Sequence, residues 1–164
     1  MPIVLVRVDE RLIHGQVLEG WVPSTRAEEL FIANDALADD LIQQEILSSA
    51  VPFSVKVVID SVDRIASLLM RENERDVRRM ILVDNPLDAL RLKKLGVNFD
   101  RLNLGNLTAN SAVASLSRSV ILGNDSLRAL LNIVEEGVRV HIQSVPFEKS
   151  VDFCEVCDCL PEER

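Results

Sequence analysis

Residues 3–17, with the sequence IVLVRVDERLIHGQV, decide our interpretation of the chain. Residues 3–8 are apolar and rich in β-branched side chains apart from one arginine, which predicts a buried strand. Charged residues crowd directly after it, and residues 16–22 then predict a short helix that Pro23 ends. His14 is thus expected between the carboxyl end of a first strand and the amino end of a helix.

The surroundings predicted for His14 suit an anion. Open α/β sheets bind ligands beyond the carboxyl ends of their strands, and a helix N-terminus offers unpaired N–H groups with partial positive charge. Gly15 lets the backbone approach an anion closely, and Arg7 and Arg11 are suited to phosphate oxygens. These features fit a phosphorylatable histidine, a nucleophile beside a pocket for a group of about −2 charge. The residues alone leave open an ordinary loop histidine near charges.

A resemblance to a known family separates these alternatives. Residues 9–17, DERLIHGQV, closely resemble the active-site segment of the IIB components in the mannose/fructose/sorbose family of the bacterial sugar phosphotransferase system. In the family motif R-[IV]-D-[DE]-R-L-I-H-G-Q-V the histidine carries the phosphoryl group, and the match places it at His14. Weaker resemblances follow in the family's order at residues 31–37 (FIANDAL), 102–106 (LNLGN) and 137–152 (GVRVHIQSVPFEKSVD).

The resemblance implies a phosphoryl carrier. His14 would accept phosphate from a phosphohistidine on a IIA domain and pass it to a hexose bound by the membrane components IIC and IID. Both partners must dock over the ring, so we expect His14 to be accessible to solvent. No metal or organic cofactor is implied. The expected site comprises the catalytic residues His14, Arg11 and Asp9 and the phosphate-binding residues Arg7, Gly15, Gln16, Gly105 and Asn106.

Two neighbouring carboxylates, Asp9 and Glu10, allow two interpretations. They are a paired-carboxylate catalytic site, or one orients the imidazole while the other faces water. We favour the second, with Asp9 as the partner of His14. A carboxylate bonded to one imidazole nitrogen would leave the other nitrogen's lone pair free to attack phosphorus.

Composition restricts the class of protein. A chain of 164 residues with 48% hydrophobic and 27% charged residues is typical of one globular domain. No apolar run reaches the roughly 18 residues that span a bilayer, and the N-terminus lacks a basic signal-peptide region, so we expect a cytoplasmic protein, held at the membrane only by permease components. The net charge of −8 argues against nucleic-acid binding.

Strands alternate with helices along the whole chain. This order predicts a single doubly wound α/β domain over residues 1–164, with an open, mostly parallel sheet and helices on both faces. Gly96 and Gly137 are expected to end two of the helices. Residues 73–79 predict a charged loop, and residues 150–164 a cysteine-containing C-terminal tail. The expected strands span residues 3–8, 29–33, 55–60, 80–84, 101–104, 119–122 and 138–145.

Other chemistry is weakly indicated. Neither G-x-G-x-x-G nor G-x-x-x-x-G-K-[ST] occurs, so a phosphoprotein is a better phosphoryl donor than a nucleotide. Cys154, Cys157 and Cys159 form C-x-x-C-x-C, but four-ligand closure of a metal site fails within the chain, so we expect reduced thiols. His141 lies in an alternating strand and is expected to be structural.

Two alternatives to sugar uptake stay open at this point. One is a regulatory IIB-like protein that signals through its phosphorylation state. The other is an α/β binding module that has lost its chemistry. The residues that select the sugar would belong to another polypeptide, so its identity is not readable here, and whether the chain forms a homo-oligomer is also open.

Overall fold

The computed structural model describes residues 3–71 and 76–157. Its strands join in one sheet. They are β1 (Ile3–Asp9), β2 (Glu29–Ala33), β3 (Lys56–Asp60), β4 (Arg79–Val83), β5 (Arg101–Thr108), β6 (Ala114–Ser115), β7 (Val120–Leu122), β8 (Arg139–Ile142) and β9 (Val151–Asp152). The helices are η1, a π-helix (Gln16–Trp21), α1 (Val22–Thr25), α2 (Asp35–Ala38), α3 (Leu41–Ser49), α4 (Val62–Arg71), α5 (Pro86–Lys94), α6 (Asn124–Glu135) and α7 (Phe153–Cys157).

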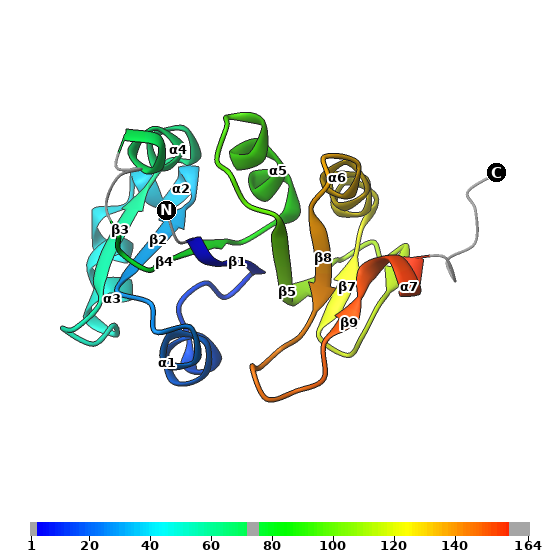
Figure 1. Cartoon of the computed structure of the whole chain (residues 1–164), viewed down its shortest axis with the longest axis horizontal. Helices are drawn as coiled ribbons and strands as arrows, with labels where there is room; N and C mark the ends of the chain where they lie inside the picture. The colour runs from blue at the N-terminus through cyan, green and yellow to red at the C-terminus, as the bar shows by residue number, and fades with distance from the viewer. Residues whose placement is uncertain (1–2, 72–75, 158–164) are drawn as a thin grey trace.

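The sheet is mostly parallel, with β1 near its centre. The strand order is β3-β2-β4-β1-β5-β7-β6, and β8 pairs with β5 and β9. Only the pairs β6–β7 and β8–β9 are antiparallel among the strands of the described residues. Figure 1 shows β1 and β4 in the middle of the molecule, with β3 at one end and the β7–β9 region at the other.

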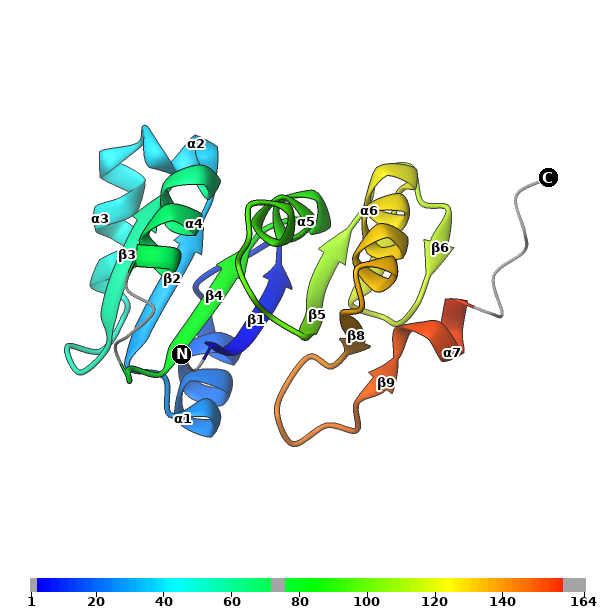
Figure 2. The ribbon, with the colours of Figure 1, turned by 45° about the horizontal axis from the view of Figure 1, so that its top comes forward.

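Helices cover both faces of the sheet, and each face has its own apolar core. On one face α4, α5, α6 and α7 pack against alternate residues of β1, β2, β4, β5 and β8. On the other face η1, α1 and α3 pack against the opposite side of β2 and β4 (Figure 2). The predicted doubly wound, mostly parallel fold is thereby confirmed.

Alternation along β1 fixes the direction of its side chains. Val6 and Val8 belong to the core under α4 and α5. Arg7 and Asp9 alternate with them and therefore point to the η1 side. Both polar side chains are fully buried, because β4 and β5 flank β1 on either side.

The sequence predicted that the first helical segment ends at Pro23, but in the structure this segment continues past Pro23. The chain passes from η1 directly into α1, where Pro23 lies in the first turn. A proline there removes only its own backbone N–H, and the neighbouring Val22 N–H still donates to the Val17 carbonyl oxygen. The segment ends instead at Arg26, whose φ of 52° is left-handed.

The prediction of a loop over residues 73–79 is wrong at the C-terminal end of this range. Residues 73–75 lie outside the described residues. Arg79 is the first residue of β4 and is fully buried. Its Nε donates to Glu29 Oε2 of β2 at 2.9 Å. Burial raises the pKa of Glu29, but the hydrogen bond from Arg79 and the charge of Lys56 outweigh it and lower that pKa.

The C-terminal region also differs from the predicted tail. Residues 151–157 form β9 and α7, and Phe153 is fully buried in the core. Residues 158–164, with Cys159, lie outside the described residues.

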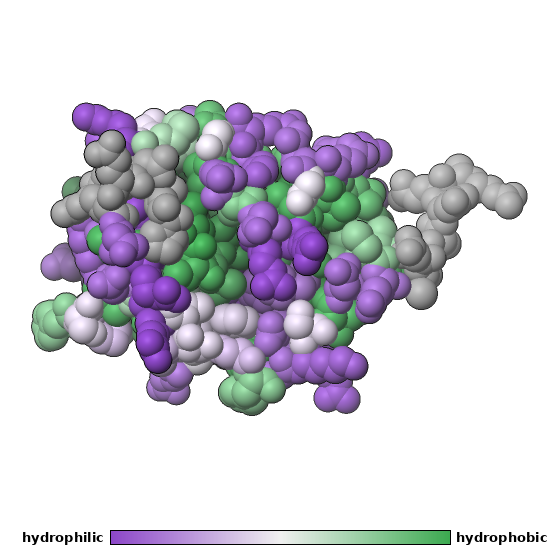
Figure 3. Space-filling model, in the orientation of Figure 1, coloured by the Kyte–Doolittle hydropathy of each residue, from purple (hydrophilic) through white to green (hydrophobic). Residues whose placement is uncertain are grey.

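The surface is mixed in polarity. Figure 3 shows polar side chains over much of one face and apolar ones gathered between them. No helix of the described residues is long and apolar enough to cross a membrane.

Candidate functional site

A tight loop after β1 brings His14 back over the end of that strand. Leu12 donates its backbone N–H to the carbonyl oxygen of Asp9 at 3.0 Å and adopts a left-handed φ of 54°. Leu12 and Ile13 are both buried in the core on the η1 side. Packing of these two side chains thus supports a backbone conformation that is unfavourable for a leucine.

The imidazole of His14 is held by Asp9. His14 Nε2 lies 2.8 Å from Asp9 Oδ2. In the described part of the chain Nδ1 has no hydrogen-bond partner. The His14 side chain is 14% exposed, so the expected access of solvent is limited to part of the ring.

Asp9 collects donors from four residues although it is fully buried. Its Oδ2 accepts from His14, Arg7 and Asn106, and its Oδ1 accepts from the backbone N–H of Arg11 at 3.1 Å. Burial raises the pKa of Asp9, but the hydrogen bonds from His14 and Asn106 and the charge of Arg7 outweigh it and lower that pKa. Asp9 is therefore an ionised acceptor, and His14 Nε2 is the nitrogen that carries the proton of their hydrogen bond.

Arg7 is fully buried and has no N–H left for a phosphate. Its Nε and Nη2 donate to Asp9 Oδ2 at 3.2 and 2.8 Å. Its Nη1 donates to Asn103 Oδ1 and to the Gln143 carbonyl, and Nη2 also donates to the Ser144 carbonyl at 3.1 Å. These contacts use all five N–H groups of the guanidinium. The phosphate contact predicted for Arg7 is not supported, because its N–H groups bind Asp9, Asn103 and two backbone carbonyl oxygens instead.

Gly105 serves the same buried arginine. It lies inside β5, which continues to Thr108 rather than ending near residue 104 as predicted. A Cβ at Gly105 would overlap the guanidinium of Arg7. The close approach that requires glycine here is therefore that of Arg7, and the predicted role in phosphate binding is not supported.

Arg11, Gln16 and Asn106 are joined by hydrogen bonds that lead to Asp9, the partner of His14. Arg11 is exposed, and its Nη2 donates to Gln16 Oε1 at 3.2 Å. Asn106 donates to Asp9 Oδ2 at 2.9 Å and to Gln16 Oε1 at 3.2 Å, which uses both of its side-chain N–H groups. A Cβ built on Gly15 would meet no atom within 4 Å, so the space beside Gly15 is open.

Several residues of the site were missed by the sequence analysis. Trp21 donates its indole N–H to the Ser144 carbonyl at 2.9 Å, and its ring lies 5.3 Å from Arg7 Cζ. Asn103 and Gln143 surround the same guanidinium. The sequence contains one signal for Asn103 and Gln143. Asn103 interrupts the apolar pattern of β5, and Gln143 follows directly after β8. Glu10 is exposed and accepts hydrogen bonds from the N–H and hydroxyl of Thr108, both at 2.9 Å.

Polar residues at the ends of other strands serve as caps. Asn34 and Asn85 accept from the N–H groups of Leu37 and Asp88, and Asn34 also donates to Asp84 at 2.7 Å. None of the hydrogen bonds given for these residues in the described ranges reaches His14. Within residues 3–71 and 76–157 there is also no group of three or more His, Cys, Asp or Glu side chains placed to hold a metal ion.

Comparison with known proteins gives consistent results. Residues 3–163 match the family model described as "PTS system sorbose subfamily IIB component". The chain is 32% identical to the N-acetylgalactosamine-specific phosphotransferase enzyme IIB component 2 of Escherichia coli K12, over 93% of this chain and 97% of that protein. It is 26% identical to the mannose-specific EIIAB component of the same strain, over 88% of this chain and 45% of that protein. The crystal structure of the IIBSor domain of the sorbose permease from Klebsiella pneumoniae has a TM-score of 0.91, with 27% identity and 99% of both chains covered.

Proposed function

The chain belongs to the sorbose subfamily of IIB components of the phosphotransferase system, and from this membership we propose that His14 is the residue on which it carries a phosphoryl group. As a IIB component it is a phosphotransferase that acts in sugar uptake. A purely regulatory role is not favoured, because the relatives are named as sugar-specific components.

The observation that supports His14 most strongly is its hydrogen bond to Asp9. The ionised carboxylate of Asp9 accepts the Nε2 proton, so the lone pair of the neutral ring is on Nδ1. Nδ1 attacks the phosphorus of a phosphohistidine on the IIA partner, a new N–P bond forms and the N–P bond of the donor breaks. The ring gains positive charge in this step. Its proton stays on Nε2, hydrogen-bonded to Asp9, and the carboxylate of Asp9 stabilises the positive charge.

Residues on the open side of His14 are suited to hold the phosphoryl oxygens. Arg11 is exposed in the same loop, three residues before His14, and supplies a positive charge. The backbone N–H groups of Gly15 and Gln16 lie at the start of η1, where amides have no partner within the helix. Positioning and charge neutralisation of this kind suffice for phosphoryl transfer, and no metal or organic cofactor enters the proposal.

The second half of the reaction requires a sugar bound elsewhere. The chain acts as a single phosphocarrier domain over residues 1–164, which receives phosphate from a IIA domain and delivers it to a hexose held by membrane IIC and IID components. The fused mannose-specific EIIAB relative supports the pairing with a IIA domain. Docking on those membrane components brings the chain to the membrane periphery.

The test of this function is the identity of the phosphorylated atom. Incubation with a phosphorylated IIA protein of the same subfamily is expected to give a phosphohistidine at His14 Nδ1, because Asp9 occupies Nε2. Long-range ¹H–¹⁵N correlation spectra of the phosphoprotein, read beside its ³¹P spectrum, distinguish the two ring nitrogens. A stable phosphate on Nε2, or on a residue other than His14, would refute the proposed geometry.

Replacing Asp9 with asparagine is expected to slow phosphoryl transfer to His14 by about 10- to 100-fold, the range seen when the partner of a functional histidine is removed. The amide keeps the shape of the carboxylate but loses its charge, and it can put an NH₂ group where four N–H donors from three residues converge. Single-turnover transfer from phosphorylated IIA measures the rate. Glu10→Gln, which alters the exposed neighbouring carboxylate, is the matched control and should stay near the wild-type rate. Equal rates for Asp9→Asn and wild type would remove Asp9 from the mechanism.

A further inference from the structure

A pocket lies on the η1 side of the sheet, and two of its lining residues, Trp21 and Gln143, contact Arg7. Its volume is about 360 Å³, which lies within the range of pockets that hold small metabolites. Its walls come from β1, η1, α1, the start of β5, and β8 with the loop after it. The polar and aromatic lining residues used below are Trp21, Ser24, Asp100, Arg101, His141 and Ser150.

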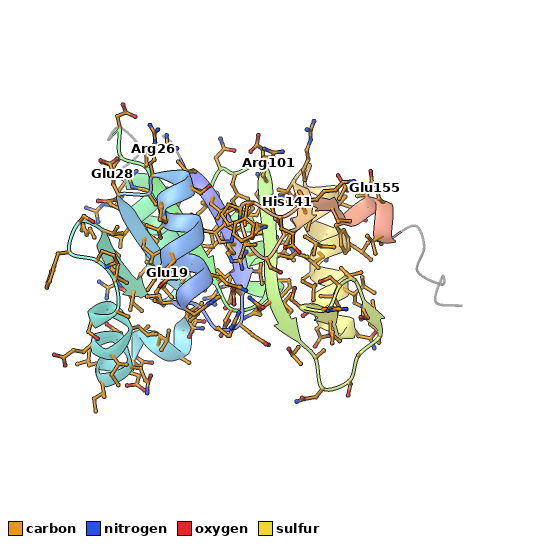
Figure 4. All side chains as sticks on the ribbon, turned by 90° about the horizontal axis from the view of Figure 1, so that it is seen from below. Glu19, Arg26, Glu28, Arg101, His141 and Glu155 are labelled. Carbon is orange, nitrogen blue, oxygen red and sulfur yellow. The ribbon has the colours of Figure 1, made fainter. Side chains whose placement is uncertain are left out.

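The register of the sheet directs His141 toward this pocket. Val140 and Ile142 of β8 belong to the core on the opposite face, so the alternating His141 points to the η1 side. On β5 the same alternation sends Arg101 to that side, since Leu102 belongs to the opposite core. Figure 4 views the molecule from this face and shows Arg101 and His141 close to one another, to the right of the helix that covers β1.

The polar groups of the pocket are not occupied by one another. Among the described residues, the side chains of Arg101, His141, Asp100, Ser24 and Ser150 form no hydrogen bond or ion pair. His141 is half-buried. Burial lowers the pKa of His141 and the charge of Arg101 lowers it further, so at neutral pH the ring offers one N–H donor and one acceptor. Arg101 is exposed and the half-buried His141 has no hydrogen-bond partner among the described residues, so both side chains are available to a ligand.

The pocket shares a wall with the network under His14. Trp21 and Gln143 line it, and both also contact Arg7 or its acceptors. The indole of Trp21 and the guanidinium of Arg7 donate to the same Ser144 carbonyl oxygen. A molecule in the pocket therefore lies one layer of side chains from Arg7, which in turn binds Asp9.

We propose that this pocket binds a small organic anion of about the size of a hexose phosphate, with Arg101 and His141 as its anion-binding groups. The charged groups near it are Arg101 and Asp100 in its lining, Arg139 in register with Arg101, Asp152 paired with His141 across β8 and β9, and Arg7 behind Gln143. Asp100 is the single carboxylate among the described lining residues, whereas Arg101, one ring nitrogen of His141 and two serine hydroxyls can donate hydrogen bonds to an anion. Asp100, Arg101 and the two serines are exposed, and His141 is half-buried. This site is additional to the proposed phosphorylation of His14 and does not depend on it.

Trp21 makes the proposal directly measurable, because it is the one tryptophan of the 164-residue chain. Glucose 6-phosphate, citrate and inorganic phosphate are titrated into the unphosphorylated protein, with neutral glucose as the matched probe. Binding is followed by Trp21 fluorescence and by calorimetry, so a ligand that leaves the fluorescence unchanged is still detected. Saturable binding of at least one organic anion is expected, with no binding of glucose.

Variants separate a built site from general attraction and from the site at His14. Arg101→Gln is expected to weaken binding about 10-fold or more, equivalent to about 1.4 kcal/mol. Arg139→Gln removes an exposed arginine directly across from Arg101 in the register of β5 and β8, outside the pocket lining, and should have little effect. His14→Ala should leave the affinity unchanged.

The proposal is overturned by any of four results. The first is no saturable binding of either organic anion up to about 10 mM, a concentration that corresponds to negligible affinity. The second is binding of glucose equal to that of the anions. The third is an equal loss of affinity in Arg139→Gln and Arg101→Gln, and the fourth is loss of binding in His14→Ala.

Discussion

Phosphoryl acceptance is expected to disappear when His14 is replaced by glutamine and to persist when His141 is replaced. The chain contains two histidines, which gives a matched pair within one protein. His14 Nδ1 has an open side and an ionised carboxylate behind its ring, whereas His141 lies on β8 and pairs in register with Asp152. Incubation with ³²P-labelled phosphorylated IIA, followed by autoradiography, should show label in wild type and His141→Gln and only background in His14→Gln.

Glutamine is chosen at position 14 to separate chemistry from folding. Its side-chain amide keeps an N–H donor for Asp9, so the variant avoids most of the roughly 1–3 kcal/mol that an unsatisfied buried acceptor costs. Circular dichroism and Trp21 fluorescence check that each variant is folded. Label retained in a folded His14→Gln, or lost from a folded His141→Gln, would contradict the assignment of the phosphoryl carrier to His14.

The fold follows from the sequence where the signal is local. Residues 30–33 are a continuous apolar run, and with Glu29 they form the buried strand β2. Gly96 and Gly137 have φ values of 99° and 84°, and their predicted places beyond α5 and α6 depend only on the conformational freedom of glycine. Strand alternation and helix ends are decided within a few residues, so sequence patterns suffice for them.

Arg7 and Gly105 show where local patterns fail. An arginine two residues before a strand's polar end, close to a histidine motif, looks like a phosphate ligand. Its burial is decided by β1 lying between β4 and β5, and its acceptors Asn103, Gln143 and Ser144 are about a hundred residues or more away in sequence. Gly105 has to be small because Arg7 passes over it. Neither fact is visible without the order of the strands.

The candidate site divides along the same line. His14, Asp9 and Arg11 lie within six consecutive residues, so a loop after a strand was enough to place them together. Asn106 was expected as a phosphate-binding residue, but its contact with Asp9 depends on the pairing of β1 with β5. Trp21, which was not expected, reaches the site through the packing of η1 on the sheet. The left-handed Leu12 was also not predictable, since a leucine adopts this conformation only when the surrounding packing enforces it.

Replacing Arg7 with methionine is expected to lower the free energy of unfolding at neutral pH by about 3–5 kcal/mol, the cost of leaving one partner of a buried ion pair uncompensated. Both Arg7 and Asp9 are fully buried, and Arg7 supplies two of the hydrogen bonds to Asp9 Oδ2. Methionine fills much of the same volume, so the loss reflects charge and hydrogen bonding rather than a cavity. Urea denaturation monitored by circular dichroism measures the difference from wild type.

The effect of pH identifies Asp9 as the origin of that loss. The fold lowers the pKa of Asp9, so its interactions stabilise the protein above the carboxyl's unfolded pKa of about 3.9 and are lost as the pH falls through the lower folded value. In Arg7→Met a protonated Asp9 is no longer an unpaired buried charge. The deficit relative to wild type should therefore be largest near pH 7 and smaller near pH 4, whereas Arg11→Met, which removes an exposed arginine four residues away, should stay within about 0.5 kcal/mol of wild type at either pH. A deficit in Arg7→Met that matched Arg11→Met, or that did not change with pH, would mean that Arg7 does not support the charge of Asp9 and that the carboxylate under His14 is stabilised by its other donors alone.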